Sequence, residues 1–203
     1  MLTRFIAILI SAVFVTPAFT AAQPQRLTIP QALARGWTGW ISGEPSGQLP
    51  TISDIVADAD LIVRGIVGTP TSYLSDDERD VYTDYPLSNP VIIHQSGVIS
   101  SRQPGVFMVA VTQLGGTVTI GNLTFTHTTL GLLPLKVNSE GLFFLKRVGD
   151  KYHIVGRYFG AFGISDGTVV PLAGREDFAP EYRGVSISEA SDNIAAHLQA
   201  LHR

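Results

Sequence analysis

The sequence predicts a mainly β fold, either a small barrel or a sandwich, with one helix at the C-terminal end. Short β-branched and aromatic runs recur along the chain and are separated by Gly and Asp turn signals. An apolar stripe at helical spacing occupies residues 186–202. The length of 203 residues suits one domain, and 45% hydrophobic with 15% charged residues excludes a disordered, solvated chain.

Charge and cysteine content exclude several functional classes. The net charge is −3, from 14 basic and 17 acidic residues, so we expect no nucleic-acid partner. The chain has no Cys, which excludes a disulfide framework, a thiolate metal site and a cysteine nucleophile. It also leaves no cysteine for lipidation. We expect no cofactor.

Residues 1–22 have the three-part layout of a secretory signal peptide. Arg4 gives a positive start, residues 5–15 are apolar apart from Ser11, and residues 20–22 are small. The apolar run is shorter than the roughly 20 residues that cross a bilayer. The sequence therefore predicts export to the periplasm or the medium, with cleavage after Ala22 and no stable membrane anchor afterwards. An uncleaved anchor is the alternative.

Residues 23–50 form a lead-in in which Pro and Gly interrupt both the helix and the strand period. One helical turn is expected at residues 29–35, before Gly36. Trp37 and Trp40 are the candidate ligand-binding residues, because their flat rings suit sugar stacking. The alternative, which we favour, is that they pin the lead-in onto the barrel, since Trp is usually highly buried.

Residues 51–203 are predicted to form a single barrel-like domain. A short helix at 54–57, capped by Ser53, comes before the strands. The expected strands are 61–68, 81–85, 91–94, 106–112, 118–120, 123–128, 141–145, 152–155 and 168–170. Hairpins are expected to pair 106–112 with 118–120 and 141–145 with 152–155, and Asp166-Gly167 is a tight turn.

The final helix, 186–202, begins with a capping-box signature from Ser186 to Glu189. We expect its apolar stripe to pack on the β core rather than on a partner. The residues of that stripe are Ile187, Ala190, Ile194, Leu198 and Leu201.

Several motifs resemble an uncharacterised group of exported bacterial domains. The segments that carry the resemblance lie at 54–67, 82–85, 111–116, 140–145, 160–163 and 166–167. The order of these segments is similar to that of netrin-like and tissue-inhibitor-of-metalloproteinase domains. This resemblance, which spans residues 51–172, implies a small OB-like antiparallel β-barrel. Such inhibitors chelate zinc with an amino-terminal cysteine, which this chain lacks, so the resemblance brings no catalytic or inhibitory residue.

The candidate catalytic residues are Asp84, His127, His153 and Ser165. Ser165 lies in a literal G-x-S-x-G motif at 163–167. A nucleophile elbow needs a helix after the serine, whereas a strand is predicted here, so a hairpin turn is the favoured interpretation. The five histidines lack metal-ligand spacing, and structural or surface roles are favoured for them.

The densest acidic cluster is the candidate metal site. It consists of Asp76, Asp77, Glu78 and Asp80. Their oxygens are suitable ligands for Ca²⁺, but the alternation and central Gly of an EF-hand loop are missing. A solvated loop is therefore favoured.

These observations lead to three hypotheses. The first is an exported, soluble, non-enzymatic binding or interaction module whose partner is an unknown protein or carbohydrate. The second is a secreted hydrolase whose site assembles only in the fold. The third is a cysteine-free protease inhibitor that acts through the loop at 71–80.

Overall fold

The computed structural model describes residues 26–43, 49–96, 109–173 and 178–201. The predicted signal peptide lies outside these residues. The helices and strands, in chain order, are α1 (Ile29–Ala34), β1 (Gly39–Ser42), α2 (Ile52–Asp58), β2 (Leu61–Val67), β3 (Thr71–Leu74), β4 (Val81–Gln95), β5 (Val109–Leu114), β6 (Gly116–Ile120), β7 (Leu123–Thr129), β8 (Glu140–Val148), β9 (Lys151–Ile154), β10 (Ala161–Ser165), β11 (Thr168–Pro171), η1 (Pro180–Tyr182) and α3 (Ile187–Leu201).

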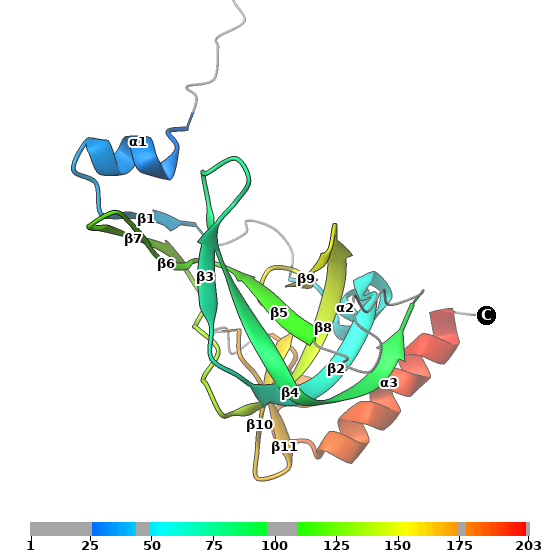
Figure 1. Ribbon diagram of the computed structural model, residues 1–203. Coiled ribbons are helices and arrows are strands. Elements are labelled where there is room, and N and C mark those ends of the chain that lie inside the picture. The colour runs from blue at the N-terminus through cyan, green and yellow to red at the C-terminus, as the bar shows by residue number, and fades with distance from the viewer. Residues whose placement is uncertain (1–25, 44–48, 97–108, 174–177, 202–203) are drawn as a thin grey trace, which may run out of the picture.

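Five strands form a closed ring in the order β2-β4-β5-β9-β8 (Figure 1). Strand β9 closes this ring, because it pairs with β5 in parallel and with β8 in antiparallel fashion. If the five ring strands alone are numbered 1 to 5 in chain order, their order around the ring is 1-2-3-5-4. This is the connectivity of an OB-type barrel. The predicted fold class, a mainly β chain with a small OB-like barrel, is therefore confirmed, and so is the hairpin that joins β8 to β9.

The barrel interior is filled by alternate residues of the ring strands. Every second residue of a strand points to the same face, so the apolar residues at one parity meet inside the ring. Its buried members on the ring strands are Leu61, Val63, Val67, Tyr85, Leu87, Val109, Val111, Phe143, Leu145 and Ile154. Leu135 and Ala161, which lie outside the ring strands, complete this cluster.

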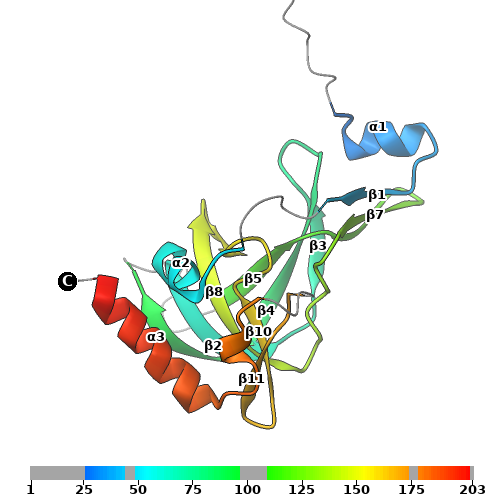
Figure 2. The ribbon, with the colours of Figure 1, turned by 180° about the vertical axis from the view of Figure 1, so that it is seen from behind.

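A second apolar cluster covers the outside of β2 and β8. There Ile62, Leu142 and Phe144 pack against α2, α3 and residues of the segments 155–173 and 178–182. Figures 1 and 2 show α2 and α3 on the same side of the barrel. Strands β2 and β8 are thus buried on both faces, which is why they appear in the sequence as continuous apolar runs rather than alternating ones.

The two flanking helices have well-formed N-terminal caps. Thr51, rather than the predicted Ser53, caps α2, and its hydroxyl and Asp54 form a capping box. The Glu189 N–H donates to Ser186 Oγ at 3.1 Å, so the predicted cap of α3 is confirmed. Helix α3 buries Ala190 and Ile194 as predicted, but Leu201 is half exposed. The helix ends beyond the surface on which it packs, which leaves its last turn in solvent.

The predicted hairpin between residues 106–112 and 118–120 is wrong. Strand β6 pairs with β7, and both join β1 in a separate three-stranded sheet. The chain leaves the barrel at Gly115 and Gly116, where φ is +106° and +135°. Side chains strongly disfavour such φ values, so the two glycines redirect the strand instead of reversing it.

The small sheet carries its own apolar cluster and lies at the end of the molecule away from α3 (Figure 1). The predicted helical turn at 29–35 forms α1, which covers one face of β6 and β7. The buried members of the cluster are Ile29, Ala32, Leu33, Val81, Val118 and Phe125. The lead-in thus supplies a helix and a strand to a folded unit.

We expect Phe143→Ala to lower the free energy of unfolding by about 3–5 kcal/mol, because it empties a fully buried position in the barrel. Urea unfolding followed by circular dichroism measures this loss. Leu133→Ala is the control, since Leu133 is 66% exposed and its truncation should change stability by less than about 0.5 kcal/mol. Equal effects for the two variants would contradict the assignment of the core.

Candidate functional site

Two clusters of polar and aromatic side chains stand apart from the apolar cores. The first, here called the tyrosine–lysine face, consists of Tyr73, Tyr82, Asp84, Lys151 and His153. Alternation along β4 places odd-numbered residues in the cores and even-numbered residues, including Tyr82 and Asp84, on the outside. Register then brings β3 and β5 beside them, because Tyr73 lies opposite Tyr82 and Thr112 lies opposite both Asp84 and His153.

Asp84 is the centre of the tyrosine–lysine face. Its carboxylate accepts hydrogen bonds from Thr112 Oγ1 at 2.8 Å, from Tyr73 Oη at 3.1 Å and from Lys151 Nζ. The Asp84 side chain keeps only 18% of its surface exposed. Three donors from three strands therefore hold the carboxylate in one orientation, and charge-assisted hydrogen bonds of this kind are the stronger ones.

The rings of the face form a continuous row across β3, β4 and β9. Lys151 Nζ lies 4.6 Å from the centroid of the Tyr73 ring. The Tyr73 and Tyr82 centroids are 6.2 Å apart, and Tyr82 meets the His153 ring edge to face at 5.4 Å. These separations are typical of interacting aromatic rings, so each ring supports its neighbour. The result is a half-buried aromatic surface bordered by a fixed carboxylate.

The electrostatics of the face are nearly neutral. Burial lowers the pKa of His153, so its imidazole is uncharged at neutral pH. The hydrogen bond to Asp84 raises the pKa of Lys151, and burial raises the pKa of both Tyr73 and Tyr82. Within the face, the Lys151 ammonium group pairs with the Asp84 carboxylate. Asp80, Asp77 and Arg157, which lie outside the face, also act on the Tyr82 hydroxyl group, with effects of opposite sign on its pKa. Such a surface suits an uncharged polar ligand better than an ion.

The second cluster, here called the histidine clasp, consists of Arg26, Ser42, Asp80, Val81 and His127. The His127 side chain has no exposed surface. Its Nε2 forms a hydrogen bond with Ser42 Oγ, and its Nδ1 accepts one from the Val81 backbone N–H at 3.4 Å. Asp80 Oδ1 lies 3.6 Å from Nδ1 and 3.0 Å from Arg26 Nη1. The clasp therefore joins β1, β4 and β7.

The clasp contains the residue types of a serine–histidine–acid relay, but its hydrogen bonds run in the other direction. In such a relay the Nδ1–H donates to the carboxylate, and Nε2 receives the serine proton. Because Val81 donates to Nδ1, the ring proton of neutral His127 must lie on Nε2, which then donates to Ser42. Burial also lowers the pKa of His127. This arrangement holds Ser42 in place and does not activate it as a nucleophile.

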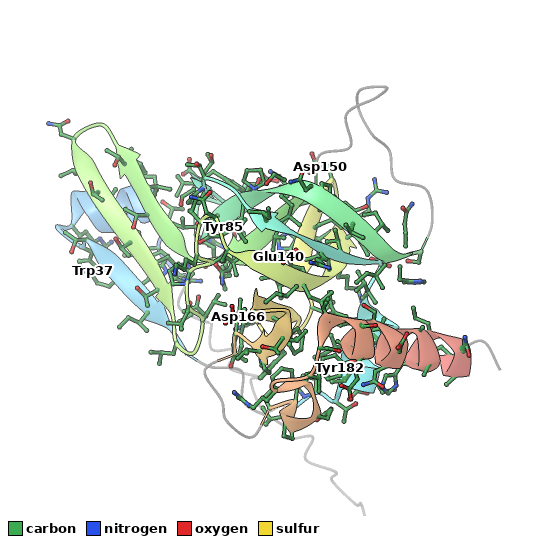
Figure 3. All side chains as sticks on the ribbon, turned by 90° about the horizontal axis from the view of Figure 1, so that it is seen from below. Trp37, Tyr85, Glu140, Asp150, Asp166 and Tyr182 are labelled. Atoms are coloured by element: carbon green, nitrogen blue, oxygen red, sulfur yellow. The ribbon has the colours of Figure 1, made fainter. Side chains whose placement is uncertain are left out.

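The four candidate catalytic residues lie on three separate parts of the molecule. Asp84 and His153 share the tyrosine–lysine face, His127 is in the clasp on β7, and Ser165 ends β10 at the hairpin to β11. Ser165 Oγ donates to the adjacent Asp166 carboxylate at 3.5 Å. A strand follows the G-x-S-x-G motif, as the sequence predicted, and Figure 3 shows Asp166 at this turn.

The acidic candidates lie in the hairpin between β3 and β4. The hydroxyl of Ser75 donates to Asp77 at 2.6 Å, and this bond lowers the pKa of the Asp77 carboxyl group. Asp80 pairs with Arg26, while the Asp76 and Glu78 residues are exposed. Within the described ranges, three or more His, Asp or Glu side chains nowhere gather closely enough to hold a metal ion.

The two tryptophans differ in environment. Trp37 is 51% exposed and lies beside the small sheet (Figure 3). Trp40 packs edge to face on Phe125 with centroids 4.7 Å apart, and the Arg26 guanidinium lies 4.4 Å from its ring centroid. Trp40 therefore fastens the lead-in, but to the small sheet rather than to the barrel.

Sequence reasoning missed Tyr73, Tyr82, Lys151 and Ser42 as members of a cluster. Alternation in residues 81–85 was a usable signal for the outward direction of Tyr82 and Asp84. No local pattern could indicate that Lys151 would lie beside Asp84 or that Ser42 would lie beside His127. Both come from strands far away in the sequence and reach these sites through strand pairing.

Comparison with protein-family models, curated proteins and solved structures gives no significant match to this chain. The resemblance to netrin-like and tissue-inhibitor domains therefore stays a prediction, whereas the barrel connectivity rests on the strand pairing. No helix among the described residues has the length and apolarity required to cross a membrane.

We expect Asp84→Ala to lower the free energy of unfolding by about 1–3 kcal/mol, because Thr112 would keep a buried hydroxyl without its acceptor. Urea unfolding at pH 7 measures the loss. Asp76→Ala removes an exposed carboxylate from the β3–β4 turn and should be neutral within about 0.5 kcal/mol. An Asp84 variant as stable as the Asp76 variant would show that the network contributes nothing.

The histidines predict a pH dependence of stability. Both His127 and His153 have a pKa lowered by burial, so the unfolded chain binds more protons than the folded one below the usual histidine pKa of about 6.5. The free energy of unfolding is therefore unaffected by these histidines above that pH. It decreases as the pH falls towards the lower pKa values that the two histidines have in the folded chain. Urea midpoints between pH 5 and 7.5 test this. The His127→Gln/His153→Gln variant should have a flatter profile, and an unchanged slope would refute the assignment.

Proposed function

We propose that this chain is an exported, non-enzymatic binding module that takes uncharged oligosaccharides on the tyrosine–lysine face. The observation that carries the proposal is the row of half-buried rings beside a fixed carboxylate on the outside of β3, β4 and β9. The export component rests on the signal-like residues 1–22, which lie outside the described part of the chain.

The position of the face on the barrel supports this proposal. OB-type barrels bind oligonucleotides and oligosaccharides on the surface of their second and third strands and on the neighbouring loops. Here those strands are β4 and β5, the connection from β2 to β4 carries Tyr73, and the strand after the tight β8–β9 turn carries Lys151 and His153. The side chains thus lie where this barrel type offers its ligand surface.

The chemistry of the face favours a sugar over a nucleic acid. Nucleic-acid binding draws most of its affinity from cations that neutralise phosphates, whereas the net charge here is −3. Lys151, the cation of the face, is already paired with Asp84. Aromatic rings offer flat apolar contact to a pyranose, and the Asp84 carboxylate, Tyr82 hydroxyl and His153 imidazole offer hydrogen bonds to its hydroxyl groups.

The hydrolase hypothesis finds less support in the contacts. Of the four candidates named for it, only Asp84 and His153 share a surface, and the serine that does meet a histidine, Ser42, receives a hydrogen bond from that ring. A nucleophile needs the opposite polarity. The protease-inhibitor hypothesis has no specific contact in its favour and stays a prediction.

We expect soluble neutral oligosaccharides, tested as a panel of chito-, cello- and xylo-oligosaccharides, to bind the purified protein in calorimetric titrations. Tyr82→Ala should weaken binding at least tenfold, which is about 1.4 kcal/mol, because it removes the central ring of the face. Trp37→Ala is the matched control, since Trp37 is an exposed aromatic residue outside the face. The Trp37→Ala variant should bind the oligosaccharide with unchanged affinity.

Two results would contradict the proposal. One is the absence of binding across the panel, and the other is binding that survives Tyr82→Ala but is lost in Trp37→Ala. A parallel incubation tests the enzymatic alternative: release of shorter sugars, or labelling of Ser42 by a fluorophosphonate probe, would move the assignment to a hydrolase.

A further inference from the structure

The N-terminal arm, residues 26–43 with α1 and β1, docks on the rest of the protein through a few contacts of different kinds. Strand β1 pairs with the edge of β7. The Ile29 N–H donates to the Glu78 carbonyl at 2.7 Å, and Arg26 pairs with Asp80. Helix α1 and Trp40 cover the apolar side of Val118 and Phe125.

His127 lies at the centre of this docking surface and uses both ring nitrogens to hold it. Nδ1 accepts the Val81 N–H from the start of β4, and Nε2 contacts Ser42 Oγ at the end of β1. This pair of hydrogen bonds needs a neutral ring, because only a neutral imidazole has an acceptor nitrogen. The ring is fully buried, so water cannot replace a lost partner.

A second proton on His127 would disturb these contacts directly. The new Nδ1–H would point at the Val81 N–H, so two donors would face each other. The charged groups near the ring are Asp80, 3.6 Å from Nδ1, and Arg26, which holds Asp80 at 3.0 Å and lies over Trp40. Asp80 would attract the imidazolium, but its carboxylate is already engaged, and Arg26 repels a second cation.

We propose that the histidine clasp is an acid-sensitive attachment: protonation of His127 loosens the N-terminal arm and uncovers the apolar side of β6 and β7 together with the edge of β7. The arm is docked at neutral pH and released in mildly acidic surroundings. Val118 and Phe125 then lose the cover that α1 and Trp40 provide. This device is independent of the ligand that the tyrosine–lysine face binds.

The direction of the pH response follows from the environment of the ring. Burial lowers the pKa of His127, while the Asp80 carboxylate raises it and Arg26 lowers it again. The arm should therefore stay docked at pH 7.5 and loosen below the ordinary histidine range.

Trp40 offers a direct optical reporter, because the chain has two tryptophans and Trp37 is half exposed and replaceable. In a Trp37→Phe background, Trp40 emission should shift to longer wavelength as the pH falls from 8 to 5. Adding His127→Gln should abolish the shift, since Gln keeps a donor toward Ser42 but does not titrate. Adding His153→Gln should leave the shift unchanged.

A flat emission profile in the Trp37→Phe protein, or an equal shift in the His127→Gln variant, would overturn the proposal. If the His127→Gln variant does not fold, amide hydrogen exchange of the unmodified protein tests the proposal instead. After correction for intrinsic rates, the Trp40–Ser42 amides should exchange faster at pH 5.5 than at 7.5, by up to about tenfold per pH unit. The β2 and β8 amides should stay more strongly protected than the arm at both pH values, because only global unfolding exposes them. Equal protection of the barrel and the arm at pH 5.5 would count against the clasp.

Discussion

The pairing of β9 with two neighbours is the constraint on which the rest of the structure depends. This strand of four residues, Lys151–Ile154, closes the ring by pairing with β5 on one side and β8 on the other. Closure removes the exposed strand edges that an open sheet would carry. It also places Lys151 and His153 beside Asp84 and Tyr82, so the same hydrogen bonds that complete the barrel assemble the candidate binding surface.

The two sides of the ring have different surroundings, and this difference separates the covered, stabilising side from the proposed binding side. On the side of β2 and β8, the strands are covered by α2, α3 and residues of the segments 155–173 and 178–182, so both strand faces are buried. On the side of β4 and β5, the outward residues include Tyr82, Asp84 and Thr112, around which the tyrosine–lysine face is built. A hydrogen-bonded carboxylate and contacting aromatic rings hold this candidate binding surface in one shape.

The small sheet shows how a loop of the barrel becomes a separate unit. Gly115 and Gly116 direct the chain out of the ring, and β6 and β7 then gain a third strand and a helix from the lead-in. His127 fills the junction between these parts with both ring nitrogens engaged. In the proposed clasp, this titratable side chain would link the attachment of the lead-in to the proton concentration.

Much of the fold was determined by the sequence alone, because local signals decide it. The alternation in β4 and β7, the continuous runs in β2 and β8, the Asp166-Gly167 turn and the Ser186 cap are all short-range patterns with short-range causes. The turn also explains why Ser165 lies in a hairpin. Only the tertiary structure decided which strand β6 pairs with, that Lys151 meets Asp84, and that Ser42 meets His127. Those contacts join residues far apart in the chain, and they depend on ring closure and on the redirection at Gly115, which no local pattern encodes.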